Sequence, residues 1–428
     1  MSTSSPTAPQ VVRASAMPEG CMTMPVVIVG GGSCGLTAAI ALRMAGVDCV
    51  ILERDVRATG STALSSGFIP AAQTRIQQSL GIEDSHEWLI EDVINKAHGQ
   101  APRPLVTAYV HAAAQAIDAL QDKGLPFEIV DGFLYPGHRV RRMHSMPERT
   151  GETFMTRLEQ LATQMGADLL TEALVRELWI DDQQRIIGVG YQRPDGSLEH
   201  LACEQLVLAC NGFGGNPAMV DELLPEMRGA TFGGHVGNDG SAISWGRAIG
   251  ARLADLGGYQ GHGSWAVPQG VLISWALMME GGVQVNARGE RFHDETGGYS
   301  EAAVHVLAQP DGIAYNLFDQ PLLDLLRTEL IEMKEKFGSP RMTEIQDLVG
   351  HVSVDLFRTP VPCRDTVVWR QGDDGIFRRF NHGRQLSQDR ADYGGSLPVS
   401  HYRRRILIKH LACHLARLIQ PIRSLKQP

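Results

Sequence analysis

Apolar and polar positions near the start of the chain follow the order strand, turn, helix, strand. Residues 25–29 form a short apolar, mostly β-branched run, as expected of a strand buried inside a parallel sheet. After a glycine-rich turn, residues 33–45 predict a helix, which Gly46 ends because glycine tolerates a left-handed cap. A second apolar run at 48–52 predicts the next strand. This order of elements predicts a βαβ unit.

The glycines of this turn, Gly30, Gly32 and Gly35, have the spacing G-x-G-x-x-G. In a nucleotide-binding unit, the first allows a tight turn and the second lets the backbone approach a pyrophosphate. The third lets the helix lie close to the strand. Ser33 and Cys34 stand at the helix N-terminus, where free N–H groups and a partial positive charge favour an anion.

An acidic residue, Glu53, follows the second strand, 23 positions after Gly30. A carboxylate at this distance can accept hydrogen bonds from a ribose diol. The motif and its context therefore predict a dinucleotide-binding unit, the alternative being a glycine-rich turn without a ligand. It does not separate NAD from FAD. The segment 58–68 mixes small and hydroxyl residues with glycines, so it can approach a flat polar ring. Its place directly after the acid favours a flavin over a plain surface loop.

Further helices and strands are predicted up to about residue 210. Helical patterning covers about 85–123, and Thr150 is a suitable N-cap for a helix reaching about Met165. The turn 193–196 predicts a small antiparallel hairpin. The predicted strands are 168–171, 175–180, 186–191, 198–203 and 205–210, the last of them as another buried parallel strand.

The amino-acid composition of the sequence changes after Asp255. Residues 257–270 are rich in glycine, histidine and aromatic residues, and residues 271–279 are apolar. A strand at 283–286 and its turn precede a loop, 294–299, that opens a helix. We therefore place a second domain at 257–360, after a first domain at 25–256.

The composition narrows the class of protein. Of the 428 residues, 43% are hydrophobic and 20% charged, which is ordinary for a soluble globular protein. The net charge of −9 argues against a nucleic-acid partner. The seven cysteines form no C-x-x-C pair, so no metal site is predicted, and reduced thiols in a cytoplasm are the simple interpretation. No apolar run reaches the ~18 residues of a membrane span. Residues 1–24 are rich in Ser, Pro and Ala and lack a signal-peptide pattern, which predicts a disordered tail.

Together these motifs resemble the fumarate reductase/succinate dehydrogenase flavoprotein superfamily, which includes 3-ketosteroid Δ1-dehydrogenases. The resemblance runs from Val26 to about Gln320. It rests on the glycine motif, Glu53, residues 60–67, Thr150-Gly151, Gly212-Phe213-Gly214, Asn238-Asp239-Gly240 and the pattern from Val285 to Glu295. It implies an α/β Rossmann-like FAD-binding domain with an inserted α+β capping domain, and a substrate between the two.

By matching positions, the resemblance also implies which residues bind FAD. They are Gly30, Gly32, Ser33, Cys34, Gly35, Glu53, Arg54, Gly60, Ser61, Thr62, Ser65, Ser66, Gly67, Val175, Ala209, Cys210, Asn211, Gly212 and Asp239.

Three departures from the family pattern are informative. Members with covalent FAD have a histidine where this chain has Ser61, which implies noncovalent FAD. Tyr299 falls where fumarate reductases carry a catalytic arginine, as in the ketosteroid dehydrogenase pattern. Trp275 and Met278 replace the glutamate and arginine of the fumarate reductase proton path. The resemblance thus argues against fumarate reduction, and the apolar stretch 271–279 favours a larger, less charged substrate.

Two residues are candidates for catalysis. His262 falls where fumarate reductases keep a substrate-binding histidine, and the alternative is a structural histidine. For Tyr299 the alternative is an ordinary aromatic residue of the capping domain. A tyrosine or histidine there could polarise a carbonyl or exchange a proton while flavin N5 takes or gives hydride. The expected function is that of an FAD-dependent oxidoreductase acting on a C–C bond next to a carbonyl, with a small-molecule substrate and a separate electron acceptor.

The last segment departs from the family. Residues 361–428 contain eleven Arg and two Lys against five Asp and no Glu, a net charge of +8. The family's Thr-x-Gly-Gly loop and Gly-Leu-Tyr-Ala strand-turn are missing from the sequence. A basic tail for an acidic partner is one interpretation. A reading-frame change or truncation is the other, and we favour it. The alternative function is therefore a non-catalytic or defective flavoprotein that lacks the C-terminal part of the flavin site.

Overall fold

The computed structural model describes residues 8–131, 134–135, 137–266, 271–273, 275–279, 281–318, 322, 367–371 and 377–381. The chain divides into two compact units, Met1–Gly258 and Tyr259–Pro428. This division falls two residues beyond the predicted boundary between the FAD-binding and capping domains.

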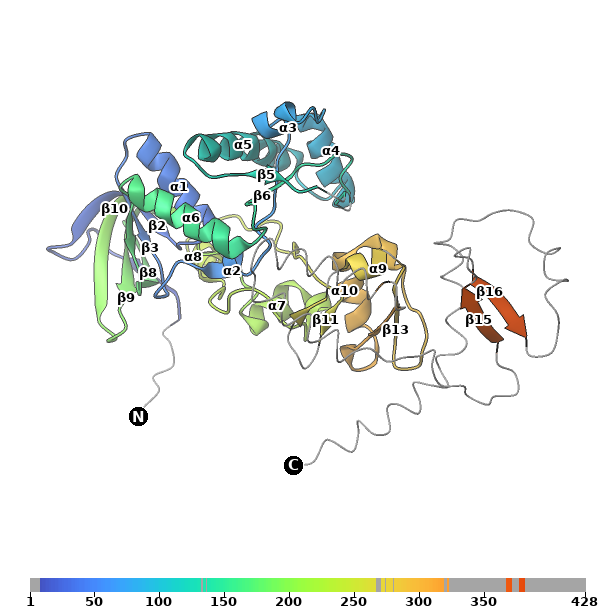
Figure 1. Ribbon diagram of the computed structural model, residues 1–428. Coiled ribbons are helices and arrows are strands. Elements are labelled where there is room, and N and C mark those ends of the chain that lie inside the picture. The colour runs from blue at the N-terminus through green and yellow to red at the C-terminus, as the bar shows by residue number, and fades with distance from the viewer. Residues whose placement is uncertain are drawn as a thin grey trace. The chain divides into compact units, whose positions relative to one another are not determined.

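The first unit contains a large sheet, a small sheet and the helices that accompany them (Figure 1). In chain order its elements are β1 (Gln10–Arg13), β2 (Met22–Val29), α1 (Ser33–Met44), β3 (Cys49–Leu52), α2 (Gly60–Ala63), β4 (Ile69–Pro70), α3 (Arg75–Ser79), α4 (His86–Lys96), α5 (Arg103–Asp122), β5 (Glu128–Ile129), β6 (Met143–Ser145), α6 (Gly151–Gln164), β7 (Asp168–Leu170), β8 (Leu174–Ile180), β9 (Ile186–Gln192), β10 (Leu198–Leu208), α7 (Pro217–Leu223), η1 (Pro225–Met227) and α8 (Ser241–Ala248).

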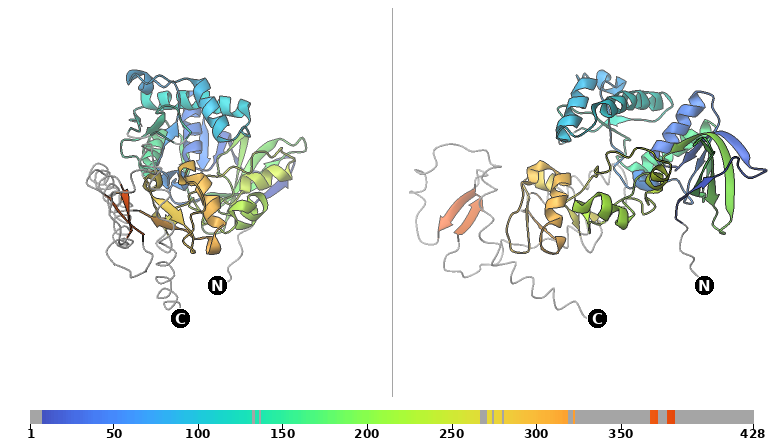
Figure 2. Two further views of the ribbon diagram at one scale, coloured as in Figure 1. Left: turned by 90° about the vertical axis from the view of Figure 1, so that its right-hand side faces the viewer. Right: turned by 180° about the vertical axis from the view of Figure 1, so that it is seen from behind.

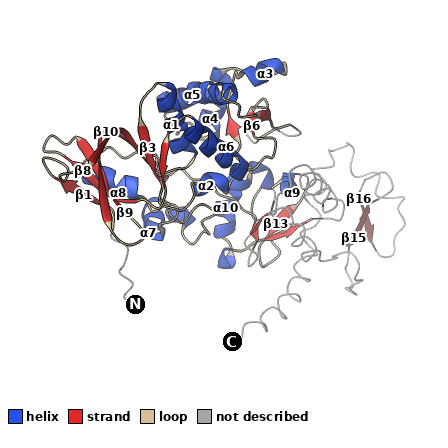
Figure 3. Ribbon diagram, turned by 60° about the vertical axis from the view of Figure 1, so that its left-hand side comes forward, coloured by secondary structure: helices blue, strands red, loops and turns tan. Residues whose placement is uncertain are grey.

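The large sheet has the strand order β1-β8-β9-β10-β2-β3-β7. Figure 3 shows its strands in red, with β1, β8, β9, β10 and β3 labelled. Strand β2 pairs in parallel with both β3 and β10, and β3 pairs in parallel with β7. Strand β9 runs antiparallel between β8 and β10, as the turn at 193–196 predicts. The unit β2-α1-β3 is the predicted βαβ, so the Rossmann-like α/β fold class is confirmed.

Strand β2 belongs to two hydrophobic cores because its side chains alternate between the faces of the sheet. Val26 and Ile28 pack in one core with residues of α1 and α6, which lie together along the sheet (Figure 1). Val27 and Val29 pack in the other core with Trp245 of α8 and residues of β8 and β9. The last four residues of β2, 26–29, are buried, as the run of apolar residues predicts.

The prediction that residues 1–24 form a disordered tail is wrong for part of that range. Residues 10–13 form β1, which pairs in parallel with β8 at the edge of the large sheet. The Gln10 amide donates a hydrogen bond of 3.0 Å to Glu177. Strand β2 begins at Met22, three residues before the predicted start. The valines at 11 and 12 favour an extended backbone, and the edge of β8 offers it a partner.

Strand β10 also differs from its prediction. The hairpin strand and the following parallel strand are one continuous element of 11 residues. Its first half pairs with β9 and its whole second half with β2. The predicted burial of residues 205–210 is wrong, because Gln205 is exposed and the Leu208 side chain is 39% exposed. Among the described residues, no strand pairs with the other side of residues 205–208.

Helices α3, α4 and α5 gather in one group (Figure 2), and residues of α3 and α5 belong to the same core cluster as Val26 and Ile28 of β2. A fully buried arginine, Arg142, ties this group together. Its guanidinium contacts Asp84 at 2.8 Å and Asp92 of α4 at 2.6 Å. Because an unpaired buried charge is costly, both carboxylates are needed to keep the arginine in place.

The second unit contains small sheets and short helices. Its elements are β11 (Trp265–Ala266), β12 (Val271–Leu272), α9 (Ala276–Met279), β13 (Val283–Val285), η2 (Glu295–Gly297), α10 (Tyr299–Leu307), η3 (Pro310–Gly312), β14 (Tyr315–Leu317), β15 (Val367–Gln371) and β16 (Phe377–Asn381). Pairs β11–β12, β13–β14 and β15–β16 are antiparallel. Most of the predicted atypical segment 361–428 lies outside the described residues. Across the described ranges, no helix has both the length and the apolar character that crossing a bilayer requires.

Candidate functional site

The three motif glycines meet different surroundings at the end of β2. Gly30 has φ +105°, and a Cβ there would lie 2.6 Å from the Ala209 oxygen. A Cβ on Gly35 would lie 2.0 Å from the Gly30 oxygen, so helix and turn can approach only without a side chain. A Cβ on Gly32 would meet no atom within 4 Å. The first and third glycines are thus required by packing, whereas the second faces open space.

The N-terminus of α1 lies at this open space. Gly32 is its N-cap, no side chain caps the helix, and its first turn carries no acid. The Ser33 hydroxyl contacts the Thr62 hydroxyl at 3.0 Å, and Cys34 is exposed. Uncapped N–H groups and the helix dipole make this end of α1 suited to an anion.

The predicted ribose ligand, Glu53, is buried beside the same turn. One of its carboxylate oxygens accepts a hydrogen bond of 2.8 Å from the Gly31 N–H, and the other accepts one of 2.9 Å from Asp55 N–H. Each carboxylate oxygen can accept a further bond. The neighbouring Arg54 donates to the Gly237 carbonyl at 2.9 Å. Glu53 is therefore fixed in position and retains acceptors for a diol.

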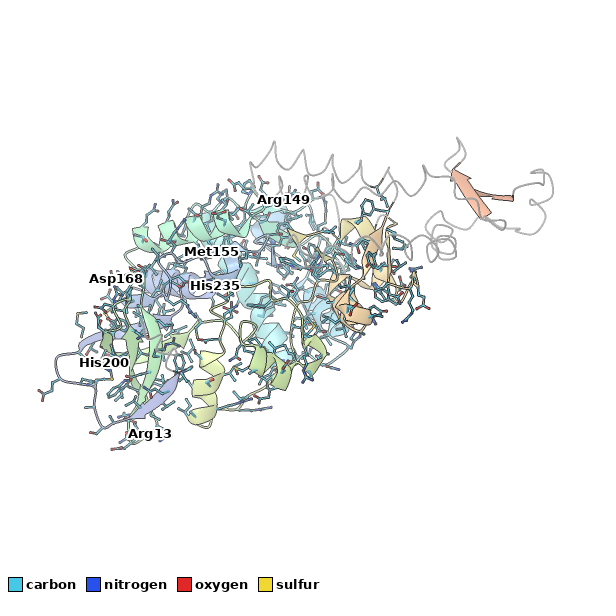
Figure 4. All side chains as sticks on the ribbon, turned by 90° about the horizontal axis from the view of Figure 1, so that it is seen from below. Arg13, Arg149, Met155, Asp168, His200 and His235 are labelled. Atoms are coloured by element: carbon cyan, nitrogen blue, oxygen red, sulfur yellow. The ribbon has the colours of Figure 1, made fainter. Side chains whose placement is uncertain are left out.

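Residues 60–67 form a short helix and turn that contact a loop from far along the chain. The Ser61 hydroxyl accepts hydrogen bonds of 2.9 Å from the His235 N–H and from the Asn238 amide. His235, labelled in Figure 4, also contacts Asp55 through Nε2 at 2.9 Å. The loop 233–240 is thereby held against the residues that follow β3.

The rest of the 60–67 segment packs on the start of α6. Ser65 accepts a hydrogen bond of 2.8 Å from Gly151 N–H through its carbonyl oxygen. Gly67 has φ +67°, and a Cβ there would lie 3.1 Å from the Gly151 Cα. Ser66 is exposed. Thr150 caps α6, as the sequence predicts, by accepting from the Thr153 N–H at 3.2 Å.

The predicted contacts after β10 lie beside the first glycine. Ala209 N–H donates to the Val29 carbonyl at 2.9 Å, so the turn after β10 adjoins the turn after β2. Burial raises the pKa of Cys210 to about 11, and this thiol is protonated at neutral pH. Asn211 has φ +66°, and a Cβ on Gly212 would meet no atom within 4 Å. This turn offers a second stretch of open backbone.

Two predicted residues lie to the side of these turns. The Asp239 carboxylate accepts from the Ser241 N–H at 3.0 Å at the start of α8. The Val175 side chain is buried in the core shared with α8, so only its backbone is available to a ligand.

These features fit FAD. The uncapped end of α1 and the open backbone at Gly32 suit a diphosphate, and the buried Glu53 suits the adenosine ribose. The segment 60–67 offers hydroxyls and backbone groups for the rest of the cofactor. Ser61 stands where covalent members of the resembled family carry a histidine, and its hydroxyl accepts two hydrogen bonds from the loop 233–240. Noncovalent binding of FAD stays a prediction.

In the second unit, the two predicted catalytic residues lie together. The rings of His262 and Tyr299 are stacked, with centroids 5.0 Å apart and planes inclined by 19°. The Tyr299 hydroxyl accepts a hydrogen bond of 2.9 Å from the Gln260 amide, which leaves its own proton free to be donated. Trp275 meets His262 edge to face at 5.9 Å.

The protonation state of His262 follows from its contacts. Its Nδ1 accepts a hydrogen bond of 3.2 Å from the Ser264 N–H, so in the neutral ring Nε2 carries the proton. Burial lowers the pKa of His262 to about 4. At neutral pH this histidine is therefore an uncharged donor through Nε2 rather than an imidazolium acid.

A buried amide, Gln284 of β13, connects the segment beneath His262 to the rest of the unit. Its Nε2 donates to the Gly263 carbonyl and to Asn316, each at 2.8 Å. Because a carbonyl can only accept, the orientation of this amide is fixed. The Gln284 oxygen then faces His293 Nε2 at 2.8 Å, which must carry a proton. This network fixes the backbone on either side of Ser264, which bonds His262.

Positive charge is scarce in this part of the chain. Residues 259–318 contain two arginines and no lysine. Arg288 pairs with Glu290 at 2.7 Å, and Arg291 pairs with the buried Glu295. Both arginines therefore already have carboxylate partners.

Sequence reasoning missed several residues that the structure adds. Asp55 and His235 form a contact across 180 positions, and no local pattern marks either of them. Gln284 stands in a short strand whose other residues, Val283 and Val285, suggest only burial. A polar residue between two apolar ones is the signal that could have identified it.

The chain belongs to the FAD-binding domain family, whose sequence profile matches residues 25–379. Both the resemblance and FAD as cofactor are thus confirmed. The match extends well beyond residue 320, where the resemblance of motifs ends, and includes the start of the atypical segment.

Three known proteins illustrate the similarity. An NADH:fumarate oxidoreductase from Klebsiella pneumoniae (strain 342) is 30% identical over 82% of this chain and 38% of its own length. The open conformation of a flavocytochrome c3 fumarate reductase has a TM-score of 0.65 at 25% identity, covering 78% of this chain and 61% of that one. A 3-ketosteroid-Δ4-(5α)-dehydrogenase from Rhodococcus jostii RHA1 has a TM-score of 0.59 at 24% identity, covering 71% and 68%.

These relatives are oxidoreductases by name, which is the predicted class. The chain spans 38% of the length of the Klebsiella protein and 61% of the flavocytochrome chain. The ketosteroid dehydrogenase supports the fold alone. Substrate and reaction therefore have to be argued from the residues of this chain.

Proposed function

We propose that this chain is an FAD-dependent oxidoreductase that acts on a C–C bond next to a carbonyl in an apolar substrate. The observation that carries the proposal is the stacked pair of His262 and Tyr299. Both side chains are neutral hydrogen-bond donors, and a carbonyl oxygen is the acceptor that such donors suit. FAD, when bound, supplies the two-electron chemistry by exchanging hydride at N5.

The protein's part in this reaction is to hold and polarise the substrate. Tyr299 donates through its hydroxyl, whose position the Gln260 amide fixes at 2.9 Å. His262 donates through Nε2 and keeps that role across the neutral range because its pKa is about 4. Drawing electron density toward the carbonyl oxygen acidifies the neighbouring C–H bond, so that its proton would pass to solvent water while the hydride would pass to the flavin.

The scarcity of free cations supports an uncharged substrate over a dicarboxylate. Carboxylates are usually bound by arginine or lysine, and both arginines in residues 259–318 are paired. Trp275 and Met278 are buried in the hydrophobic core of the same unit and provide no charge for a carboxylate. A ketosteroid-like or other apolar ketone therefore suits this unit better than fumarate does. In the oxidative direction, electrons would pass from the reduced flavin to a separate acceptor.

Anaerobic flavin reduction tests the proposal. The FAD-loaded protein is mixed with a 3-ketosteroid or with succinate, and bleaching of the flavin band is followed; the reduced protein is mixed with the unsaturated ketone or with fumarate. We expect turnover with the ketones only. Tyr299→Phe should slow it by about a hundredfold or more, the usual scale for loss of one hydrogen-bond donor to a polarised carbonyl oxygen. Tyr315→Phe, which alters a tyrosine of β14, is the matched control.

Faster turnover with fumarate or succinate would contradict the choice of substrate, and an unchanged rate in Tyr299→Phe would remove the catalytic role of that residue. A second candidate, a non-catalytic flavoprotein, is favoured by the half-exposed residues 205–208 of β10 beside the cofactor turn. It predicts FAD binding without reduction by any of these compounds.

A further inference from the structure

Arg176 stands at an irregular point of the large sheet. The pairing of β8 with β9 shifts register between Val175 and Glu177, so Arg176 is the bulged residue. A bulge redirects the side chain it carries, and bulges are frequent beside functional sites. Val175 and Glu177 on either side are buried, whereas the Arg176 side chain is 12% exposed.

The guanidinium of Arg176 is incompletely paired among the described residues. Its Nε is buried, and no described atom forms a hydrogen bond with it. The nearest carboxylate, on Asp239, is 4.0 Å away, beyond hydrogen-bond distance. Burial accordingly lowers the pKa of Arg176, which the Asp239 charge only partly offsets. A cation in this condition is costly unless an anion completes its shell.

The surroundings of Arg176 indicate which anion could complete the shell of its guanidinium. Arg54, the residue after Glu53, adds a like charge that disfavours the guanidinium further. The segment before β8 runs beside Glu53, because Ala173 N–H donates to the Glu53 carbonyl at 2.8 Å. Two of the neighbours of Arg176, Arg54 and Asp239, are predicted cofactor residues. The group thus lies among the residues that are predicted to hold the ADP half of the cofactor.

We propose that Arg176 binds the diphosphate of FAD and so holds the ADP half of the cofactor. The diphosphate is the anionic part of FAD, and a guanidinium matches phosphate oxygens with two parallel hydrogen bonds. The missing partner of Nε and the repulsion from Arg54 are then both relieved by one ligand. The apoprotein holds Arg176 at a cost in stability that cofactor binding removes.

The test measures cofactor affinity and apoprotein stability in the same variants. Apoprotein carrying Arg176→Met, Arg176→Lys or Arg185→Met is titrated with FAD, followed by flavin fluorescence, and with ADP, followed by calorimetry. Thermal unfolding of each apoprotein is recorded. Arg185 is the matched control. It lies in the turn between β8 and β9, its side chain is 71% exposed, and it pairs with Asp181 of the same turn.

We expect Arg176→Met to weaken both FAD and ADP by about tenfold or more, the scale of a charge-assisted hydrogen bond. Its apoprotein should unfold at the same or a higher temperature, because a poorly paired buried cation has been removed. Arg176→Lys should recover part of the affinity, and Arg185→Met should match the unaltered protein.

Three results would overturn the proposal. Affinities of Arg176→Met equal to those of Arg185→Met would show that the arginine does not bind the cofactor. Weaker FAD with unchanged ADP would place its action at the flavin half. A lower unfolding temperature of the Arg176→Met apoprotein, without recovery of affinity in Arg176→Lys, would make Arg176 a structural partner of Asp239.

Discussion

Gly32 and Gly35 allow a sharp test, because one added methyl group should have opposite consequences at two positions three residues apart. At Gly32 the new Cβ meets no protein atom within 4 Å, and φ is −67°, which alanine adopts freely. At Gly35 it lies 2.0 Å from the Gly30 carbonyl oxygen. The protein alone therefore tolerates the first methyl group and excludes the second.

The expected magnitudes follow from these distances. In Gly32→Ala the apoprotein should lose no more than about 1 kcal/mol, the cost of a poorer N-cap. The methyl group takes space needed by the diphosphate, and losing about two hydrogen bonds to it costs roughly 3 kcal/mol, a hundredfold in affinity. In Gly35→Ala the clash is with backbone, which cannot rotate away, so the apoprotein should lose roughly 3 kcal/mol or more.

The assays are urea unfolding of the two apoproteins, followed by circular dichroism, and titration with FAD, followed by flavin fluorescence. Normal FAD affinity in Gly32→Ala would refute the placement of the diphosphate at the open turn. A stable Gly35→Ala apoprotein would refute the claim that the helix touches the turn. Alanine at Gly124, whose Cβ would also meet no atom, is not a suitable control, because its φ of +96° is strained for alanine.

Three further predictions concern other parts of the molecule. Glu53→Gln should weaken FAD and ADP by about tenfold, because an amide offers one oxygen where the carboxylate offers two; equal affinities in a titration would contradict the role of Glu53. Asp84→Asn should destabilise the apoprotein by about 3 kcal/mol in urea unfolding, because Arg142 stays buried with one charge partner; a change below about 1 kcal/mol would show that Arg142 finds another. Burial lowers the pKa of His262 to about 4, below the 6.5 of a free histidine, so the unfolded chain binds the extra proton between these values. Stability should therefore fall as the pH drops through this window, and His262→Gln should make the fall shallower; an identical pH dependence of unfolding would contradict the burial of this ring.

Local patterns in the sequence were sufficient for the cofactor turn. The end of the strand before Gly30, the start of α1 at Ser33 and the N-cap Thr150 depend on neighbours within a few residues, and each is found where predicted. Contacts between distant segments were not predictable in this way. Strand β1 forms because β8, more than 160 residues later, offers an edge, and the composition of residues 1–24 does not reveal it.

The same limit applies to the candidate site. The stacking of His262 on Tyr299 joins positions that the family resemblance marked separately, without placing them in contact. The burial of residues 205–210 was predicted wrongly. An apolar run shows that a strand can be buried, but it does not show which neighbours cover the strand. Arg176 could not be singled out, because a bulge depends on the register of two strands rather than on either sequence.

Strand β2 packs in two hydrophobic cores at once, and this has a consequence for how the cofactor is retained. The strand ends in the turn where the diphosphate of FAD is expected, and its side chains pack in both cores of the unit. Its amides should exchange with solvent only when the whole unit opens, since no smaller fluctuation releases the strand. Because FAD would bind the folded unit and not the unfolded chain, occupancy by FAD and global folding are linked equilibria, and a higher FAD concentration should stabilise the fold.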